Sequence, residues 1–167
     1  TIPSSVISIG SYAFSGCSSL TQITIPSSVI SIGNYAFHKC SLIKQIVIPT
    51  SITSIEEGTF SGCSHFNGQL TIQNNVEYID SSSFSGCSGF NGPLIIPNSV
   101  HTIGQNSFSN CSGFTSLNLS IFISSIGSNA FSGCSGFKCQ LQLPYFIEKI
   151  GEGTFSKCSK LNGPLTI

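Results

Sequence analysis

Seven Phe-x-x-Cys motifs carry the side chains of this chain that are best suited to chemistry. Their thiols recur every 23 or 24 residues, and the stretch FSGCSGF occurs twice, at 84–90 and 131–137. The thiols are Cys17, Cys40, Cys63, Cys87, Cys111, Cys134 and Cys158. Evenly spaced thiols can bind zinc, form disulfides or serve as small buried apolar side chains. Which role applies depends on where the repeat places them.

Other apolar positions recur with the same period. Ile lies five residues before each Phe of the motif, and Val or Ile lies eight residues before it. A large apolar residue follows each Cys by three positions, and an alternating pair such as Leu94/Ile96 comes next. The alternating pair predicts a short strand with one buried face, and the Val-x-x-Ile step predicts a second extended segment. The stretch through Phe and Cys predicts a turn or a single helical or 3₁₀ turn.

Repeats of this kind bury their apolar faces only by stacking on one another. We therefore predict a solenoid of seven 23–24-residue repeats. A position that recurs once per coil then lies on a line along the solenoid, with neighbours about 4.8 Å apart.

Thiols on such a line cannot converge on one tetrahedral zinc ion. Disulfides between adjacent coils are not excluded by distance, but the odd number of thiols and their side-by-side projection favour a buried, reduced ladder. We expect the seven ladder thiols to be shielded. Cys139 replaces a turn glycine away from the ladder, so it alone is expected to react quickly.

The sequence CSSLTQITIPSSVISIGNYAF at 17–37 follows the pattern C-x-x-L-x-x-I-x-I-P-x-x-V-x-x-I-G-x-x-A-F throughout. This pattern resembles the BspA-like, or Treponema-type, leucine-rich repeat, and the likeness covers the whole chain. Gln73 and Ser120 depart from it, because they stand where Pro is usual. The resemblance implies a right-handed leucine-rich-repeat solenoid, α/β or mainly β, with short parallel strands on the concave side and turns or short helical turns on the convex side. It also implies a protein on the cell surface or in the extracellular space, similar to adhesins that bind host matrix proteins or other cells.

Composition narrows the classes of partner. Only 7% of the residues are charged, six Lys balance six Asp and Glu, and Arg is absent, so the chain lacks an electrostatic footprint for nucleic acid or anionic membrane. We find no convergent set of catalytic groups and expect neither enzymatic activity nor a cofactor.

Glu56 and Asp80, with Glu57 and Glu77 nearby, fall on adjacent coils. Four carboxylates could hold Ca²⁺, although a solvated acidic patch is the favoured interpretation.

The outward positions of the alternating strands form the candidate concave face, which is uncharged and rich in amides and hydroxyls. Its main members are Gln22, Thr24, Gln45, Val47, Gln69, Thr71, Ile95, Asn118 and Gln142; the other outward positions are Pro93, Ser116, Gln140, Pro164 and Thr166. The face suits a protein or glycan partner, or it serves solubility alone. Asn110 and Asn118 begin N-x-S sequons, and a glycan on Asn118 would stand on this face.

Four residues break the repeat's own rule. The two positions before the Val or Ile of the second extended segment are small and polar in repeats one to five, but they become Ile121-Phe122 and Tyr145-Phe146 in repeats six and seven. If they are exposed, they form one apolar cluster on a turn edge and bind a neighbouring chain or ligand. The alternative is that the turn folds inward and buries them.

These observations predict one domain over residues 1–167. Both ends stand at the same phase of the repeat, so we expect it to be an interior segment of a longer protein. The favoured function is a non-enzymatic surface recognition or adhesion module for protein–protein or cell–cell contacts. Its expected partner is a protein, from a host or a second copy of the chain. The rival is a structural scaffold or spacer that packs into a larger assembly or filament.

Overall fold

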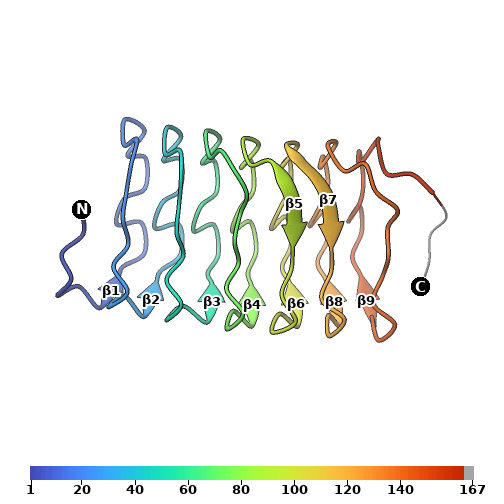
Figure 1. The fold of residues 1–167 in the computed structure, drawn as a ribbon, viewed down its shortest axis with the longest axis horizontal. Coiled ribbons are helices and arrows are strands. Elements are labelled where there is room, and N and C mark those ends of the chain that lie inside the picture. Colours follow the sequence, from blue (N-terminus) through green and yellow to red (C-terminus); the bar gives the residue numbers. More distant parts are fainter. Residues whose placement is uncertain (164–167) are drawn as a thin grey trace.

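The computed structural model describes residues 1–163, and in it the chain is a parallel β-solenoid whose coils stack side by side (Figure 1). Each coil contributes one two-residue strand from the Val-x-x-Ile step. These strands are β1 (Ser8–Ile9), β2 (Ser31–Ile32), β3 (Ser54–Ile55), β4 (Tyr78–Ile79), β6 (Thr102–Ile103), β8 (Ser125–Ile126) and β9 (Lys149–Ile150). The described residues contain no helix. The predicted solenoid of seven repeats is therefore confirmed.

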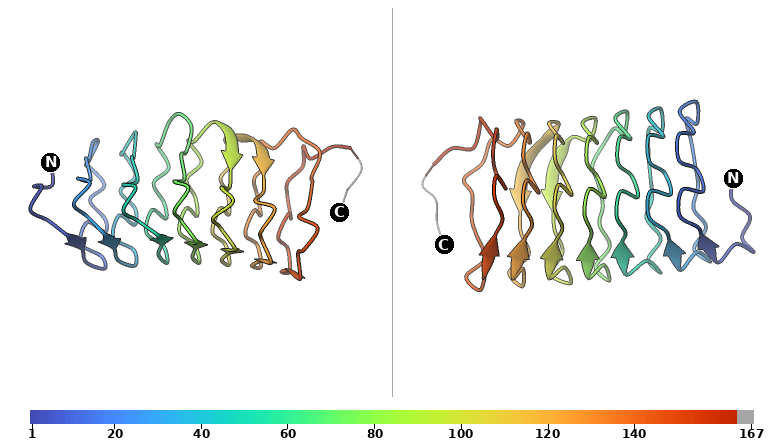
Figure 2. Two further views of the ribbon diagram at one scale, coloured as in Figure 1. Left: turned by 60° about the horizontal axis from the view of Figure 1, so that its bottom comes forward. Right: turned by 180° about the vertical axis from the view of Figure 1, so that it is seen from behind.

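The two-residue strands form ladders in which equivalent residues of successive coils face one another. β1 pairs with β2, and β3, β4, β6, β8 and β9 form one five-stranded parallel sheet. Ile55 lies opposite Ile79, and Ile79 lies opposite Ile103. Figure 2 shows these strands in one row along the molecule. Because each strand is followed by its neighbour one repeat later, residues at the same position of successive repeats lie in lines along the solenoid.

Among residues 1–163 the alternating pair forms a regular strand in only two repeats. These strands are β5 (Gly92–Ile95) and β7 (Phe114–Asn118), which pair in parallel with an irregular register between Gly92 and Pro93. In the first three repeats the equivalent segments are extended but make single hydrogen bonds, such as Lys44 N to Thr21 O at 3.3 Å, in place of a ladder. The expectation of a strand at this pair in every repeat is therefore wrong.

The segment around each motif Phe alternates between two kinds of hydrogen bond. In the first coil Phe14 N donates to Ala36 O of the next coil at 2.8 Å, whereas Cys17 N donates back to Phe14 O at 3.1 Å. This alternation puts the residues two before and two after Phe in the left-handed region, as for Tyr12 at φ 60° and Gly16 at φ 75°. Glycine adopts that conformation without strain, which explains the Gly of FSGC.

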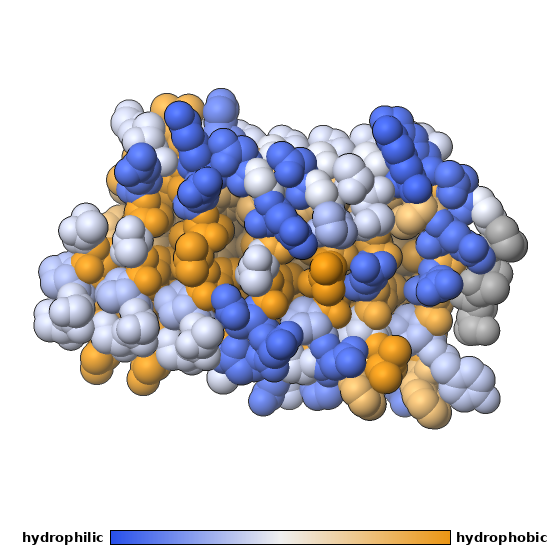
Figure 3. Space-filling view, viewed as in Figure 1, coloured by the Kyte–Doolittle hydropathy of each residue, from blue (hydrophilic) through white to orange (hydrophobic). Residues whose placement is uncertain are grey.

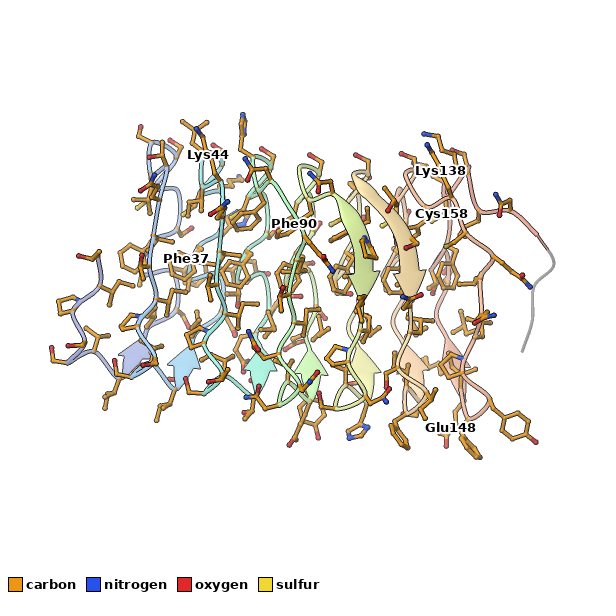
Figure 4. The ribbon with its side chains drawn as sticks, in the orientation of Figure 1. Phe37, Lys44, Phe90, Lys138, Glu148 and Cys158 are labelled. Atoms are coloured by element: carbon orange, nitrogen blue, oxygen red, sulfur yellow. The ribbon has the colours of Figure 1, made fainter. Side chains whose placement is uncertain are left out.

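The core consists of parallel lines of apolar side chains. Seven Phe rings stack from Phe14 to Phe155 with centroid distances of 5.3 to 5.6 Å. A second line includes Phe66, Phe90 and Phe114, whose rings meet those of the first line at steep angles, 66° for Phe60 and Phe66. In Figure 4 Phe37 and Phe90 lie inside the coils, whereas Lys44, Lys138 and Glu148 lie at the edges. The predicted core phases are thus confirmed.

Candidate interaction surfaces

The ladder thiols are free and lie in the core. Six of them, from Cys40 to Cys158, are buried and no disulfide forms. Each of these six thiols donates a hydrogen bond to the carbonyl of a Phe in the preceding coil, as in Cys40 Sγ to Phe14 O at 3.0 Å and Cys63 Sγ to Phe37 O at 3.2 Å. A thiol at this position therefore fills a small buried space and also satisfies a main-chain acceptor. The sequence did not indicate the second role.

Burial keeps these thiols protonated. Desolvation raises the pKa of Cys40 to about 11 and that of Cys63 to about 12, and it raises the pKa of Cys87 as well. A neutral, buried thiol is a poor nucleophile and a poor metal ligand. The ladder is consequently a structural feature.

Cys17 is the exception, because it is exposed. The expectation that every ladder thiol is shielded is wrong at this position. Each other ladder thiol lies against a Phe carbonyl of the coil before it, whereas Cys17 belongs to the first of the seven coils described. Cys139, which lies away from the ladder, is partly buried.

The acidic residues of repeats three and four do not converge. Glu56 accepts a hydrogen bond from Ser54 Oγ, Asp80 accepts one from Ser81 N at 2.5 Å, and Glu57 accepts one from Tyr35 Oη at 2.6 Å. Within residues 1–163 no three His, Cys, Asp or Glu side chains lie close enough to hold a metal ion. Glu56, Glu57 and Asp80 therefore each have a donor of their own within the chain.

Tyr35 is a contact that the repeat pattern did not predict. Its ring stacks on Tyr12 at 5.2 Å and meets His38 edge-on at 5.6 Å. The hydrogen bond to Glu57, with desolvation, raises the pKa of Tyr35 to about 12. The sequence has Tyr at the same position of two successive repeats, and this could have predicted the stacking, because equivalent residues of neighbouring coils are in contact.

The face that carries β5 and β7 presents all nine residues predicted for the concave face. Every one of these nine is exposed, from Gln22 and Thr24 in the first coils to Asn118 and Gln142 in the later ones, whereas the outward positions Pro93 and Ser116 are partly buried. They alternate with buried residues such as Leu94 and Ile96, as the strand pattern requires. Pro164 and Thr166 lie outside the described residues.

Two neighbouring shallow grooves cross this face between the first coils. One has a volume of about 440 Å³ and is lined by Gln22, Thr24, Gln45, Val47 and neighbours that include Lys44. The next, of about 350 Å³, continues past Gln69 and Thr71. The grooves lie where the backbone lacks a regular hydrogen-bond ladder, so main-chain polar groups add to the side-chain amides. Lys44 is the only charged residue in their lining.

The four apolar residues of repeats six and seven are all solvent-exposed. The exposed fractions are 60% for Ile121, 54% for Phe122, 81% for Tyr145 and 71% for Phe146. The rings of Tyr145 and Phe146 meet edge-on at 5.1 Å. The turn has not folded inward, so these residues form an apolar surface, which we call the edge cluster.

A family model described as BspA type leucine rich repeat region, in six copies, matches residues 1–92 and 90–163. A leucine-rich repeat protein from Bacteroides ovatus superposes with a TM-score of 0.86 at 35% identity, over 93% of this chain and 40% of that one. The T. pallidum leucine rich repeat protein superposes with a TM-score of 0.83 at 29% identity, over 94% of this chain and 72% of that one. A leucine rich cell surface protein from Faecalibacterium prausnitzii superposes with a TM-score of 0.83 at 28% identity, over 96% of this chain and 42% of that one.

The chain thus spans well under half the length of the Bacteroides ovatus and Faecalibacterium prausnitzii chains. Comparison with curated proteins gave no match. In residues 1–163 we found no helix of the length and apolarity needed to cross a membrane. The family model covers nearly all of the described residues, and the structure has the fold that it requires. The chain belongs to the BspA type leucine rich repeat family.

Proposed function

We propose that this chain is a non-enzymatic recognition or adhesion module at a cell surface or in the extracellular space. Its membership of the BspA type family supports this function, as does its similarity to a solved structure described as a leucine rich cell surface protein. Stacked repeats offer a partner an extended surface without needing a deep pocket.

The observation that carries the proposal is the face around β5 and β7. Nine exposed side chains stand in rows across successive coils, and grooves lined by mostly uncharged residues run between the first of them. Amides and hydroxyls both donate and accept hydrogen bonds, so such a face fits an uncharged protein or glycan surface better than a phosphate or a charged metabolite. Val47 and Ile95 add exposed apolar contacts.

Adhesion of protein-coated beads tests this proposal. Beads that carry the chain are expected to attach to cultured epithelial cells or to immobilised fibronectin, collagen or laminin. Changing Gln45 and Gln69 to Glu keeps side-chain shape but introduces charge into a neutral contact. We expect attachment to fall about tenfold or more, the effect of about 1.4 kcal/mol of lost binding energy.

Gln105→Glu is the matched control, because Gln105 is exposed but belongs to a turn away from this face. That variant should attach like the wild type. Absence of attachment by the wild type to every surface, or equal loss in both variants, would contradict a recognition role for this face.

A structural scaffold or spacer is the second candidate function. The edge cluster favours it, because four exposed apolar residues on a turn provide a packing contact that has no need of a host ligand. Electron microscopy of the concentrated chain would then show ordered side-by-side assemblies.

A further inference from the structure

The turn edge that carries the edge cluster has apolar side chains at both of its ends. The edge cluster lies in repeats six and seven, and Ile7 and Ile30, each 64% exposed, protrude from repeats one and two. Figure 3 shows apolar atoms at the lower left and lower right of the molecule, with polar atoms between them. Five coil steps separate the two groups, a distance of roughly 24 Å.

The aromatic residues of the edge cluster replace side chains that bond one coil to the next. In repeats two to four the residue before the Val or Ile donates to a carbonyl of the preceding coil. These bonds run from Ser28 Oγ to Val6 O at 2.7 Å, from Ser51 Oγ to Val29 O, and from Asn75 Nδ2 to Ile52 O at 2.8 Å.

Phe122 and Phe146 occupy this position in repeats six and seven and have no side-chain donor. The coil-to-coil bond is limited to repeats two to four, because the equivalent Ser99 Oγ of repeat five is buried without a hydrogen-bond partner. Both rings keep more than half of their surface exposed, and the ring contact that Phe146 makes is with Tyr145 of the same cluster. A contiguous cluster of exposed large apolar side chains is typical of a contact surface.

The rest of the edge carries little charge. Repeats three and five present Thr53 and His101 at the position equivalent to Ile7, and repeat four presents Glu77. Repeats six and seven add only Glu148 and Lys149. A two-fold axis through the centre of this edge would bring repeat one opposite repeat seven and repeat two opposite repeat six. Each apolar end then meets the other apolar end of the second molecule.

We propose that this edge pairs two copies of the chain in antiparallel orientation. The edge cluster of each copy covers Ile7 and Ile30 of the other, as a closed, isologous contact requires. Glu77 lies near the axis and meets its own counterpart there. Added salt should therefore strengthen the pair, because it screens this repulsion and leaves apolar contacts intact.

Sedimentation velocity over a concentration series, with reductant present because Cys17 is exposed, tests the pairing. The wild type should shift from monomer to dimer with rising concentration, and more so at high salt. Phe122→Ser with Phe146→Ser restores the usual small polar residues and should leave a folded monomer. Ile7→Ser with Ile30→Ser should weaken the dimer too. Ile95→Ser, on the β5 face, is the control and should dimerise like the wild type.

Mixing the two double variants tests the antiparallel arrangement. A mixed pair keeps one intact contact, between the edge cluster of one variant and the isoleucines of the other, whereas each variant alone keeps none. Dimer should therefore reappear in the mixture at concentrations where each variant alone is monomeric.

Several outcomes would overturn the proposal. They are a wild type that stays monomeric up to roughly 1 mM, a dimer unaffected by the Phe122/Phe146 variant, and a mixture that stays monomeric. A monomeric wild type whose edge cluster captures a different protein would also overturn it. Thermal melting of both double variants confirms that they are folded, and little change is expected because all four replaced side chains are exposed.

Discussion

Phe84 lies in the middle of the Phe stack, so its replacement by Ala measures how much the stack stabilises the solenoid. Its side chain has no exposed surface and stacks on Phe60 at 5.4 Å and on Phe108 at 5.3 Å. It also meets Phe90 edge-on at 6.4 Å. Truncating a buried Phe costs about 3–5 kcal/mol. Each lost aromatic pair costs about 0.5–1.5 kcal/mol beyond the loss of buried apolar area. We therefore expect Phe84→Ala to lower the free energy of unfolding by an amount near the upper end of that range of about 3–5 kcal/mol.

Urea titration followed by circular dichroism measures this loss as a lower midpoint. The slope of the transition needs checking as well, because stacked repeats can unfold in parts. Phe14→Ala is the matched control, since Phe14 is half-buried and stacks only on Phe37. We expect a loss of about 1–2 kcal/mol there. A loss below about 1 kcal/mol for Phe84→Ala, or equal losses for both variants, would refute the reasoning.

Three further changes test other contributions to the stability of the fold. Ser83→Ala and Ser107→Ala should each raise the free energy of unfolding by about 1 kcal/mol in urea, because both buried hydroxyls lack a hydrogen-bond partner and Ala36 fills the equivalent position; a loss would contradict this. Lys39→Gly should stabilise by about 0.5–1 kcal/mol in the same assay, because Lys39 has φ 55° and a left-handed conformation is unfavourable for a side chain; a clear destabilisation would count against it. Stability should fall above pH 9, because the pKa of Cys63 is about 12 in the folded chain against 9.0 when unfolded, so ionisation above pH 9 favours unfolding; urea midpoints that stay flat from pH 9 to pH of about 11 would contradict this.

Periodicity alone was enough to predict which residues form the core. Val76, Ile79, Phe84, Cys87 and Phe90 were each assigned from their phase in one repeat, and each is buried. A residue that recurs once per coil meets its own counterpart, so burial in one coil implies burial in the others. The argument fails for Cys17 in the first coil, which is exposed, and it is weaker for the alternating pair, where Ile46 and Leu119 are only partly buried.

The hydrogen bonding was not accessible from the same pattern. Both extended segments of the repeat look alike in hydropathy, and only the backbone spacing makes the Val-x-x-Ile step the regular ladder. The left-handed positions are hidden because Tyr12, Ser82 and Asn106 occupy one phase with equivalent backbone geometry. For the candidate surfaces, alternation predicted the exposed positions, whereas the shape of the grooves depends on how the coils are spaced.

Counting reactive thiols in the folded chain tests the central claim most directly, which is that the repeated Phe-x-x-Cys motif forms a buried, reduced ladder. The account predicts two fast thiols, Cys17 and Cys139, six slow ones, and all eight after denaturation without reductant. Changing Cys17 and Cys139 to Ser should remove the fast phase. Fast labelling of three or more thiols, or fewer than eight reactive thiols after denaturation, would contradict it.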